Sequence, residues 1–151
     1  MERRVRYVQD ERIGIYGLLH ETHARIERVC DATIQRKVGI SAGVHEVLLR
    51  LARSHDRRLK VTALGAALDV TTGGATRLVN RVVALGFATK EPDPADRRVQ
   101  WVVLTPLGRD VVERATRLHL ADLERELFSR LTRDERTDLV RLLTRLREET
   151  P

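Results

Sequence analysis

Two apolar stripes separated by a short break mark residues 61–87 as a pair of consecutive helices. In the first stripe, Val61, Leu64 and Leu68 recur at the i, i+3 and i+7 spacing of one helix face. The pattern stops at residues 69–71. It then resumes with Ala75, Leu78, Val79, Val82 and Leu85. Two helices joined by about three residues are typical of a helix-turn-helix motif.

The polar face of the second helix carries no acidic residue. At about 100° per residue, the face opposite the apolar stripe holds short or hydrogen-bonding residues, namely Gly73, Thr76, Arg77, Asn80, Arg81 and Ala84. Such a face can approach phosphates and base edges. Gly73 and Gly74 lie near the helix start, where each costs about 1 kcal/mol relative to Ala. Close approach of the backbone to a ligand would explain them.

A turn rich in Pro and Asp lies between two segments that are predicted to form a β-hairpin. Residues 87–90 and 99–104 are expected to be its strands, and the second contains Val and Trp, which are favoured in sheets. The tip of the turn between them presents Arg97 and Arg98 beside Asp93 and Asp96. We interpret the two carboxylates as structural residues that form ion pairs with the arginines and shape the hairpin, because this is commoner than acid-base chemistry in a turn.

Several of these residues together resemble the MarR family of winged-helix transcription regulators. The similarity is carried by Leu64, Leu68, Thr76, Arg77, Arg81, Gly86, Asp93, Pro94, Asp96, Arg98, Leu104, Thr105 and Gly108. Its most specific part is the Asp-x-Arg turn, followed by a strand that ends in Leu-Thr. The resemblance implies a mostly α (α+β) fold, in which a winged helix-turn-helix head has a two-stranded wing. It also implies that the N- and C-terminal helices form a dimerisation region.

The length and composition fit this fold. A chain of 151 residues is the size of one domain, and with 3% aromatic residues its core must consist of Leu, Val, Ile and Ala, which suits packed helices. We expect a single domain over residues 1–151, with the DNA-binding part at about 41–105 and dimerisation helices at about 10–38 and 106–149. No apolar run approaches the roughly 20 residues of a membrane span, so we expect a cytoplasmic protein with no membrane partner.

The positive charge is concentrated in the predicted head. The formal net charge is +6. Residues 41–105 hold 10 Lys or Arg against 6 acids, whereas residues 106–151 hold 10 of each. An Arg-rich coding bias would raise the charge everywhere, and the neutral C-terminal third argues against that explanation. The excess therefore favours a nucleic-acid partner for the head.

The sequence offers little support for catalysis. It contains no Gly-rich phosphate loop, no Gly-x-Ser-x-Gly elbow and no persuasive carboxylate pair, so we expect neither an enzyme nor a cofactor. The one cysteine, Cys30, excludes an intrachain disulfide, and its place on an apolar stripe predicts a buried, inert thiol. His20 and His23 are three residues apart on the first helix, so together with Cys30 they leave a metal-responsive regulator as an alternative.

The favoured prediction is a homodimeric, ligand-responsive regulator of double-stranded DNA, most often a repressor in the resembled family, on a pseudopalindromic operator. The predicted DNA-binding residues are Thr71, Thr72, Gly73, Thr76, Arg77, Asn80, Arg81, Arg97 and Arg98. On the second helix, Arg suits guanine and Asn suits adenine through paired hydrogen bonds. At the wing, Arg97 and Arg98 are expected to contact the flanking minor groove or its phosphates. Asp93 and Asp96 are assigned to the structure of the wing.

Two alternatives come from other functional classes. A winged-helix module that binds protein would share the fold, and salt-sensitive binding to a DNA duplex would separate it from a regulator. For a small metal-dependent or histidine-based enzyme, the sequence offers only scattered histidines. Neither the protein-binding module nor the enzyme explains the acid-free helix face. The resemblance further implies a small, often aromatic or phenolic effector held between the dimer helices and the head, but no residue cluster identifies it.

Overall fold

The computed structural model describes residues 8–68 and 70–148, and the side chain of Thr72 lies outside this description. It divides into two compact units. The central unit runs from Asp31 to Leu120, and the terminal unit comprises the residues up to Cys30 and those from Ala121 onward. Two long helices, α1 (Glu11–Val38) and α5 (Pro106–Glu126), run through both units. The unit limits therefore fall inside helices.

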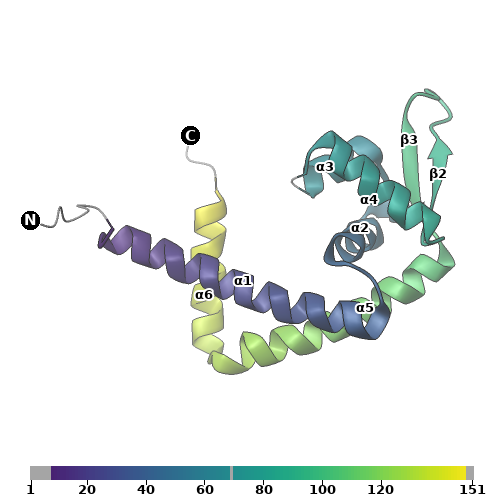
Figure 1. Ribbon diagram of the computed structural model, residues 1–151. Helices are drawn as coiled ribbons and strands as arrows, with labels where there is room; N and C mark the ends of the chain where they lie inside the picture. The colour runs from purple at the N-terminus through teal and green to yellow at the C-terminus, as the bar shows by residue number, and fades with distance from the viewer. Residues whose placement is uncertain (1–7, 69, 149–151) are drawn as a thin grey trace, which may run out of the picture. The chain divides into compact units, whose positions relative to one another are not determined.

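The central unit contains the predicted helix-turn-helix (Figure 1). Helix α1 ends at Val38 and is followed by Gly39, which has a positive φ of 81°. Ser41 then starts α2 (Ala42–Arg53) by accepting a hydrogen bond from the Val44 backbone N–H at 3.4 Å. The next helices are α3 (Val61–Ala67) and α4 (Thr72–Ala84). Thr71 caps α4, because its hydroxyl accepts from the Gly74 N–H at 3.2 Å. Both helices of the motif thus lie where the apolar stripes place them.

Aliphatic side chains from α1, α2, α3, α4 and the wing strand that ends at Leu104 fill the core of the central unit. The largest fully buried ones are Ile34, Val47, Leu48, Leu51, Leu64, Val79, Val82 and Val102. At the contact of α3 with α4, a Cβ on Gly65 would lie 3.3 Å from the Ala75 Cβ, so a small residue lets the two helices pack closely. The apolar face of α4 is thereby fixed against α2 and α3, and its other face turns to solvent.

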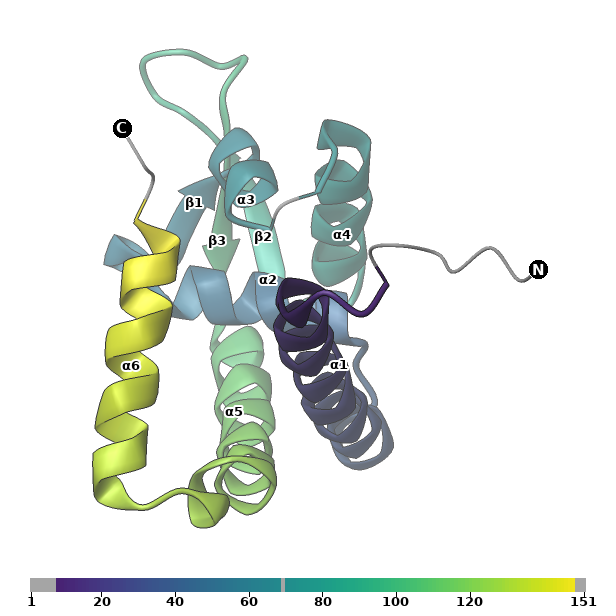
Figure 2. The ribbon, with the colours of Figure 1, turned by 90° about the vertical axis from the view of Figure 1, so that its left-hand side faces the viewer.

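The central unit also contains a three-stranded antiparallel sheet, whose strands are visible in Figure 2. The strands are β1 (Arg58–Lys60), β2 (Ala88–Pro92) and β3 (Gln100–Leu104), in the order β1-β3-β2. The two-stranded wing predicted from the sequence corresponds to β2 and β3, which pair from Ala88 opposite Leu104. The sequence did not predict β1, because three residues with one apolar member are too short to display strand alternation.

The base of the wing is joined to α5 by Thr105. Its backbone N–H donates to the Phe87 carbonyl at 3.0 Å, and its hydroxyl donates to the Gly86 carbonyl at 2.8 Å and accepts from the Gly108 N–H at 3.0 Å. A Cβ on Gly108 would collide with the Phe87 carbonyl and lie 2.8 Å from Leu104 Cδ1. Residue 108 is therefore glycine because the wing backbone approaches the first turn of α5 closely.

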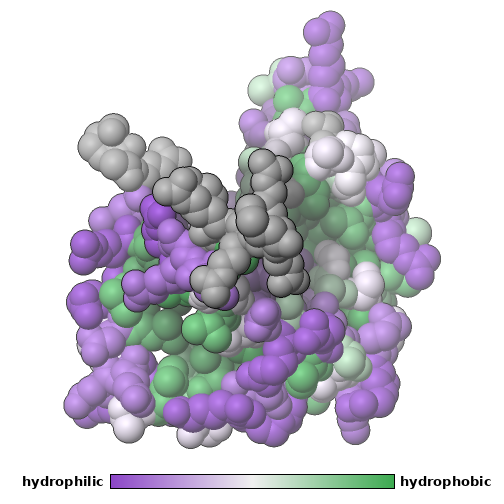
Figure 3. All heavy atoms as spheres, turned by 60° about the vertical axis from the view of Figure 1, so that its left-hand side comes forward, coloured by the Kyte–Doolittle hydropathy of each residue, from purple (hydrophilic) through white to green (hydrophobic). Residues whose placement is uncertain are grey.

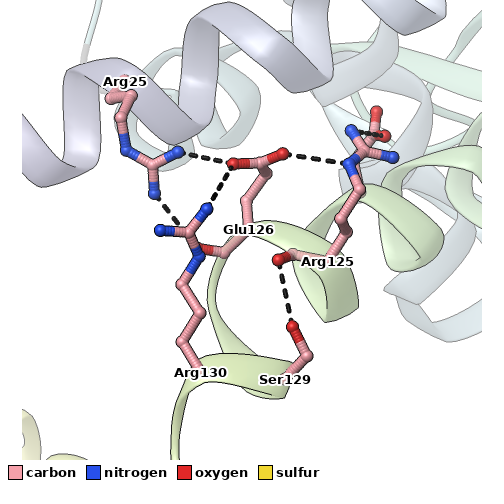
Figure 4. Close-up of polar contacts among 6 residues, drawn as sticks. Arg25, Arg125, Glu126, Ser129 and Arg130 are labelled. Carbon is pink, nitrogen blue, oxygen red and sulfur yellow. Dashed lines mark hydrogen bonds and ion pairs between the residues drawn. The ribbon is translucent and has the colours of Figure 1, made fainter.

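In the terminal unit, Glu126 at the end of α5 is the centre of a charged network (Figure 4). Its carboxylate accepts from the guanidinium groups of Arg25 and Arg125, and Arg130 lies 3.6 Å away. The contacts with Arg25 and Arg125, with that of Arg25 the strongest, lower the pKa of Glu126. The first turn of α5 lies in the central unit, so this network concerns only the other end of that helix.

The last helix, α6 (Arg133–Arg147), follows the short turn η2 (Phe128–Arg130). It begins at a capping box, in which Thr132 accepts from the Glu135 N–H at 3.3 Å and the Glu135 carboxylate accepts from the Thr132 N–H at 2.8 Å. None of its residues is buried. Among the helices of the described ranges, none has the length and apolarity needed to cross a membrane.

Candidate nucleic-acid interface

The exposed face of α4 is the one that the sequence predicts. Ala75, Val79 and Val82 are buried. The exposed positions are Gly73, Thr76, Arg77, Asn80, Arg81 and Ala84. Thr71 is also exposed, whereas the side chain of Thr72 falls outside the described residues. No acidic residue occurs between Thr71 and Lys90, so this face is positively charged and rich in hydrogen-bond donors.

The two glycines at the start of α4 have different surroundings. A Cβ on Gly74 would lie 3.4 Å from the Thr71 hydroxyl and from Val70 Cβ, which is ordinary contact. A Cβ on Gly73 would meet nothing within 4 Å. Packing inside the chain therefore does not require glycine at position 73. A surface that approaches the first turn of α4 from outside would require it, as the sequence suggested.

One polar contact joins the wing to the exposed face of α4. The Lys90 ammonium on β2 donates a hydrogen bond to the Asn80 side-chain oxygen at 2.7 Å. Lys90 lies two residues after buried Ala88 and therefore on the same side of the strand. The sequence analysis did not include Lys90 in the site. Strand alternation counted from Ala88 would have placed its side chain on the side that packs against α4.

The carboxylates of the wing turn accept hydrogen bonds from backbone N–H groups and from the Trp101 side chain, and not from an arginine side chain. Asp93 accepts from the N–H groups of Ala95 and Asp96 at 2.9 and 3.3 Å and from Trp101 Nε1 at 2.8 Å. Asp96 accepts from the Arg98 backbone N–H at 3.0 Å. Within the described ranges neither carboxylate forms an ion pair, so the ion pairing predicted for this turn is wrong. The short Asp side chains reach the N–H groups of their own turn first.

The hydrogen bonds to Asp93 favour its ionised form as well as fixing the shape of the turn. The Trp101 indole N–H, and after it the Ala95 N–H, lower the pKa of Asp93. Arg97 and Arg98 remain exposed, and in the described part of the chain their guanidinium groups take part in no ion pair. The wing tip therefore presents two arginines, held on a turn that the aspartates stabilise.

Further cations lie around Trp101 of β3, at the end of the strand next to the wing turn. The Arg58 guanidinium lies 4.6 Å and the Lys60 ammonium 5.3 Å from the centroid of its ring. Both distances are within the range of cation–π attraction. Both cations come from β1, the strand that the sequence did not predict, so the positive surface of the sheet is larger than the sequence indicated.

The histidines are not arranged as a metal site formed by His20, His23 and Cys30 would need. His20 and His23 are exposed and Cys30 is buried, and no group of three possible metal ligands occurs among the described residues. Instead His45 of α2 and His119 of α5 lie with their ring centroids 5.5 Å apart. Burial, and then the neighbouring His119, lower the pKa of His45. The sequence could not show this pair, because the two residues come from distant helices.

A cleft of about 510 Å³ opens between α2, the turn η1 (His55–Arg57), the end of β3 and α5, all within the central unit. Its apolar lining comes from Leu49, Ala52, Leu104, Val112 and Leu120. Its charged lining consists of Arg53, Arg57, Arg109, Arg117 and Glu113. Glu113 pairs with Arg117 at 3.1 Å, which leaves the other guanidinium groups as an excess of positive charge over an apolar floor.

Arg57 enters this cleft from an unusual backbone. Asp56 and Arg57 both have positive φ values, 57° and 54°, in the left-handed region that non-glycine residues rarely adopt. Arg58, the next residue, begins β1, and α3 starts at Val61 directly after that strand. A ligand that contacts Arg57 would therefore act on a strained turn that leads into both the sheet and the helix-turn-helix.

Comparison with known proteins places the whole chain beside transcription regulators. The MarR family model matches residues 38–99. The multiple antibiotic resistance protein MarR of Escherichia coli is 36% identical over 139 residues, which is 91% of this chain and 93% of that protein. The crystal structure of Sco3205, a MarR family transcriptional regulator from Streptomyces coelicolor, in complex with DNA has a TM-score of 0.84 and 26% identity, covering 96% of this chain and 91% of that one.

A third similarity concerns the fold alone. BpsR of Bordetella bronchiseptica, whose DNA binding is regulated by 6-hydroxynicotinic acid, has a TM-score of 0.79 at 22% identity and covers 98% of this chain and 100% of its own. The central unit and the helices that flank it in sequence thus have counterparts in solved structures.

Proposed function

This chain belongs to the MarR family of transcriptional regulators, and from that premise we propose that it is a ligand-responsive repressor that binds a specific double-stranded DNA sequence as a homodimer. The observation that carries the proposal is the exposed, acid-free face of α4 next to a wing with two exposed arginines. A protein-interaction module would share the fold, but it would not need a helix face free of carboxylates.

In this proposal α4 enters the major groove and the wing contacts the DNA beside it. The residues proposed to contact DNA from α4 and its cap are Thr71, Thr72, Gly73, Thr76, Arg77, Asn80 and Arg81. Arg77 is placed to donate two hydrogen bonds to guanine. Arg97 and Arg98 are placed on the flanking minor groove or its phosphates. The structure of the Streptomyces relative in complex with DNA supports DNA as the partner.

The homodimer is proposed because the terminal unit exposes apolar side chains. On α6 these are Val140, Leu142, Leu143 and Leu146, with exposed fractions between 45% and 74%. On the first half of α1 they are Ile13, Ile15, Tyr16, Leu18 and Leu19, with fractions between 50% and 69%. Apolar side chains also reach the surface in Figure 3. So many exposed large apolar side chains on two helices indicate an interaction site, and a second copy of the chain is the proposed occupant.

Selection from a pool of random DNA duplexes by the purified protein tests the function. We expect the recovered sequences to share a pseudopalindrome whose half-sites lie about one duplex turn apart, roughly 34 to 36 Å, because a two-fold dimer carries two copies of α4. Binding should weaken steeply as salt rises. Recovery of no common sequence, or of a single asymmetric site bound by a monomer, would contradict the proposal and favour the protein-interaction alternative.

The cleft between α2, η1 and α5 is the place proposed for the effector. An apolar floor surrounded by an excess of guanidinium groups fits a small amphipathic anion, such as an aromatic carboxylate. Arg57 connects the cleft to β1 and α3 through the strained turn. Because a ligand shifts an equilibrium only by its differential affinity, the effector would act by favouring a conformation of this turn in which the wing and α4 bind DNA less well.

Benzoate and its neutral analogue benzamide are suitable probes for the cleft. We expect benzoate to raise the melting temperature of the wild-type protein and benzamide to have much less effect. Since a hydrogen bond to a charged group contributes about 1.5 to 3 kcal/mol, Arg57→Gln should weaken benzoate binding by about tenfold or more. The control Arg36→Gln, at an exposed position in the last turn of α1, should not. Equal binding of benzoate and benzamide, or an unchanged Arg57→Gln variant, would exclude this cleft as an anion site.

A further inference from the structure

We propose that Asn80 and Lys90 act as one unit that selects guanine in each half-site, so that Lys90 determines specificity although it belongs to the wing. The inference rests on the proposed function, in which α4 enters the major groove. It concerns the identity of one base, and it can fail while the proposed function stands.

The geometry of the pair is fixed by regular structure on both sides. Asn80 lies on the exposed face of α4, directly after buried Val79. Lys90 lies on β2 opposite Val102 of β3, and it shares its side of the strand with buried Ala88. The strand thus directs Lys90 toward α4, where its ammonium donates to the Asn80 oxygen at 2.7 Å.

The chemistry of the two side chains settles the orientation of the amide. An ammonium has three donors and no acceptor, so the Asn80 atom that faces it must be the oxygen. The Asn80 amino group consequently points away from Lys90, and the ammonium keeps two further N–H donors. The pair therefore presents donors to its surroundings, and its one strong acceptor is engaged by a cation.

A surface of hydrogen-bond donors can distinguish guanine from adenine in the major groove, because the two bases present different acceptors there. Guanine presents two acceptors, N7 and O6, whereas adenine presents the N7 acceptor and the N6 amino donor. A paired contact from Asn to adenine needs the amide oxygen to accept from N6. Here that oxygen lies beside a positive charge, which repels the partly positive amino group. Guanine is therefore the better match, in place of the adenine that the sequence suggested for Asn80.

Among the residues that the structure describes, no carboxylate forms an ion pair with the Lys90 ammonium. Residues 71–90 contain no carboxylate, and Glu91 follows Lys90 on the opposite side of the strand. Arg77 and Arg81 lie within one helical turn of Asn80 on the same exposed face. The contact is thus part of a surface whose charged side chains are all cations, which would favour the two acceptors of guanine over the mixed edge of adenine.

The test is selection from random duplexes with the full chain and three variants. We expect the wild-type protein to prefer guanine over adenine by about five- to a hundredfold at one position of each half-site. Asn80→Ala should lose the preference at that position, which identifies it. Lys90→Met, which keeps the apolar stem and removes the donor, should change the preferred base there to adenine and leave the other positions unchanged. Lys37→Met removes the same charge outside the proposed interface and should behave as the wild type.

A modified base gives an independent measurement. Replacement of the selected guanine by 7-deazaguanine removes the N7 acceptor. It should weaken duplex binding by the wild-type protein more than duplex binding by the Lys90→Met variant. The inference is overturned if Lys90→Met still prefers guanine and loses affinity equally on all duplexes, because Lys90 would then be a phosphate contact. It is also overturned if the wild type prefers adenine at the position that Asn80→Ala identifies. A wild-type protein that selects no sequence would contradict the proposed function itself.

Discussion

Replacing Leu142 and Leu146 together by Glu is expected to convert the protein into a monomer and to lower its affinity for the selected duplex by about 10²- to 10⁴-fold, because two linked contacts gain about that factor over one. The two residues are four apart on one face of α6 and are 47% and 74% exposed. Charges at these positions remain solvated in a single chain, but in the proposed dimer they would be buried without partners, which costs several kcal/mol per ion.

Thr144→Glu is the control, because it adds a carboxylate to the same helix about 200° around its axis from Leu142. Sedimentation and duplex binding should leave this variant close to the wild type. A thermal melt followed by circular dichroism distinguishes loss of the dimer from loss of the fold in the double variant. If only the dimer is lost, the helical signal should persist up to a melting transition. If the double variant remained dimeric, or bound the duplex as a monomer with full affinity, the proposed interface would be wrong.

Local patterns were sufficient to predict the elements of the candidate site. The stripe from Ala75 to Val82 placed the buried face of α4, and its opposite face is exposed as expected. Thr105 and Thr132 cap the starts of α5 and α6 through residues three positions further along the chain. Each of these features depends on residues within a few positions of one another, so that the spacing of apolar and capping residues carries the information.

Contacts between elements could not be predicted in the same way. Lys90 and Asn80 are ten residues apart, and His45 and His119 lie on separate helices. The strand β1 is defined by its pairing with β3 and not by its own composition. The ion pairs expected for Asp93 and Asp96 were wrong because backbone N–H groups of the same turn compete for the carboxylates. Such competition is decided by geometry that a single sequence does not reveal.

Arg77→Ala and Arg97→Ala are expected to weaken DNA binding in different ways. Loss of a base contact at Arg77 should cost about 1 to 3 kcal/mol on the selected duplex and much less on a scrambled one, so that the specificity ratio falls. Loss of a phosphate contact at Arg97 should weaken binding to both duplexes. Because the proposed dimer carries two copies, Arg97→Ala should also reduce the slope of log affinity against log salt by up to about 1.8.

The wing offers one alternative outcome within the same proposal. If Arg97 enters a narrow minor groove rich in A and T, the affinity lost in Arg97→Ala should depend on the flanking base pairs. Substitution of those base pairs would reveal this dependence. Both arginines are exposed, so the melting temperatures of the two variants should stay near that of the wild type, and a change in binding can be assigned to the interface.

A salt titration of the wild type and these two variants, on selected and scrambled duplexes, tests recognition of DNA by α4 and the wing most directly. The predicted result is a selective loss for Arg77→Ala together with a general loss and a shallower salt slope for Arg97→Ala. Unchanged affinities and slopes in both variants would mean that neither α4 nor the wing touches DNA, and a protein partner would then be the better explanation for this surface.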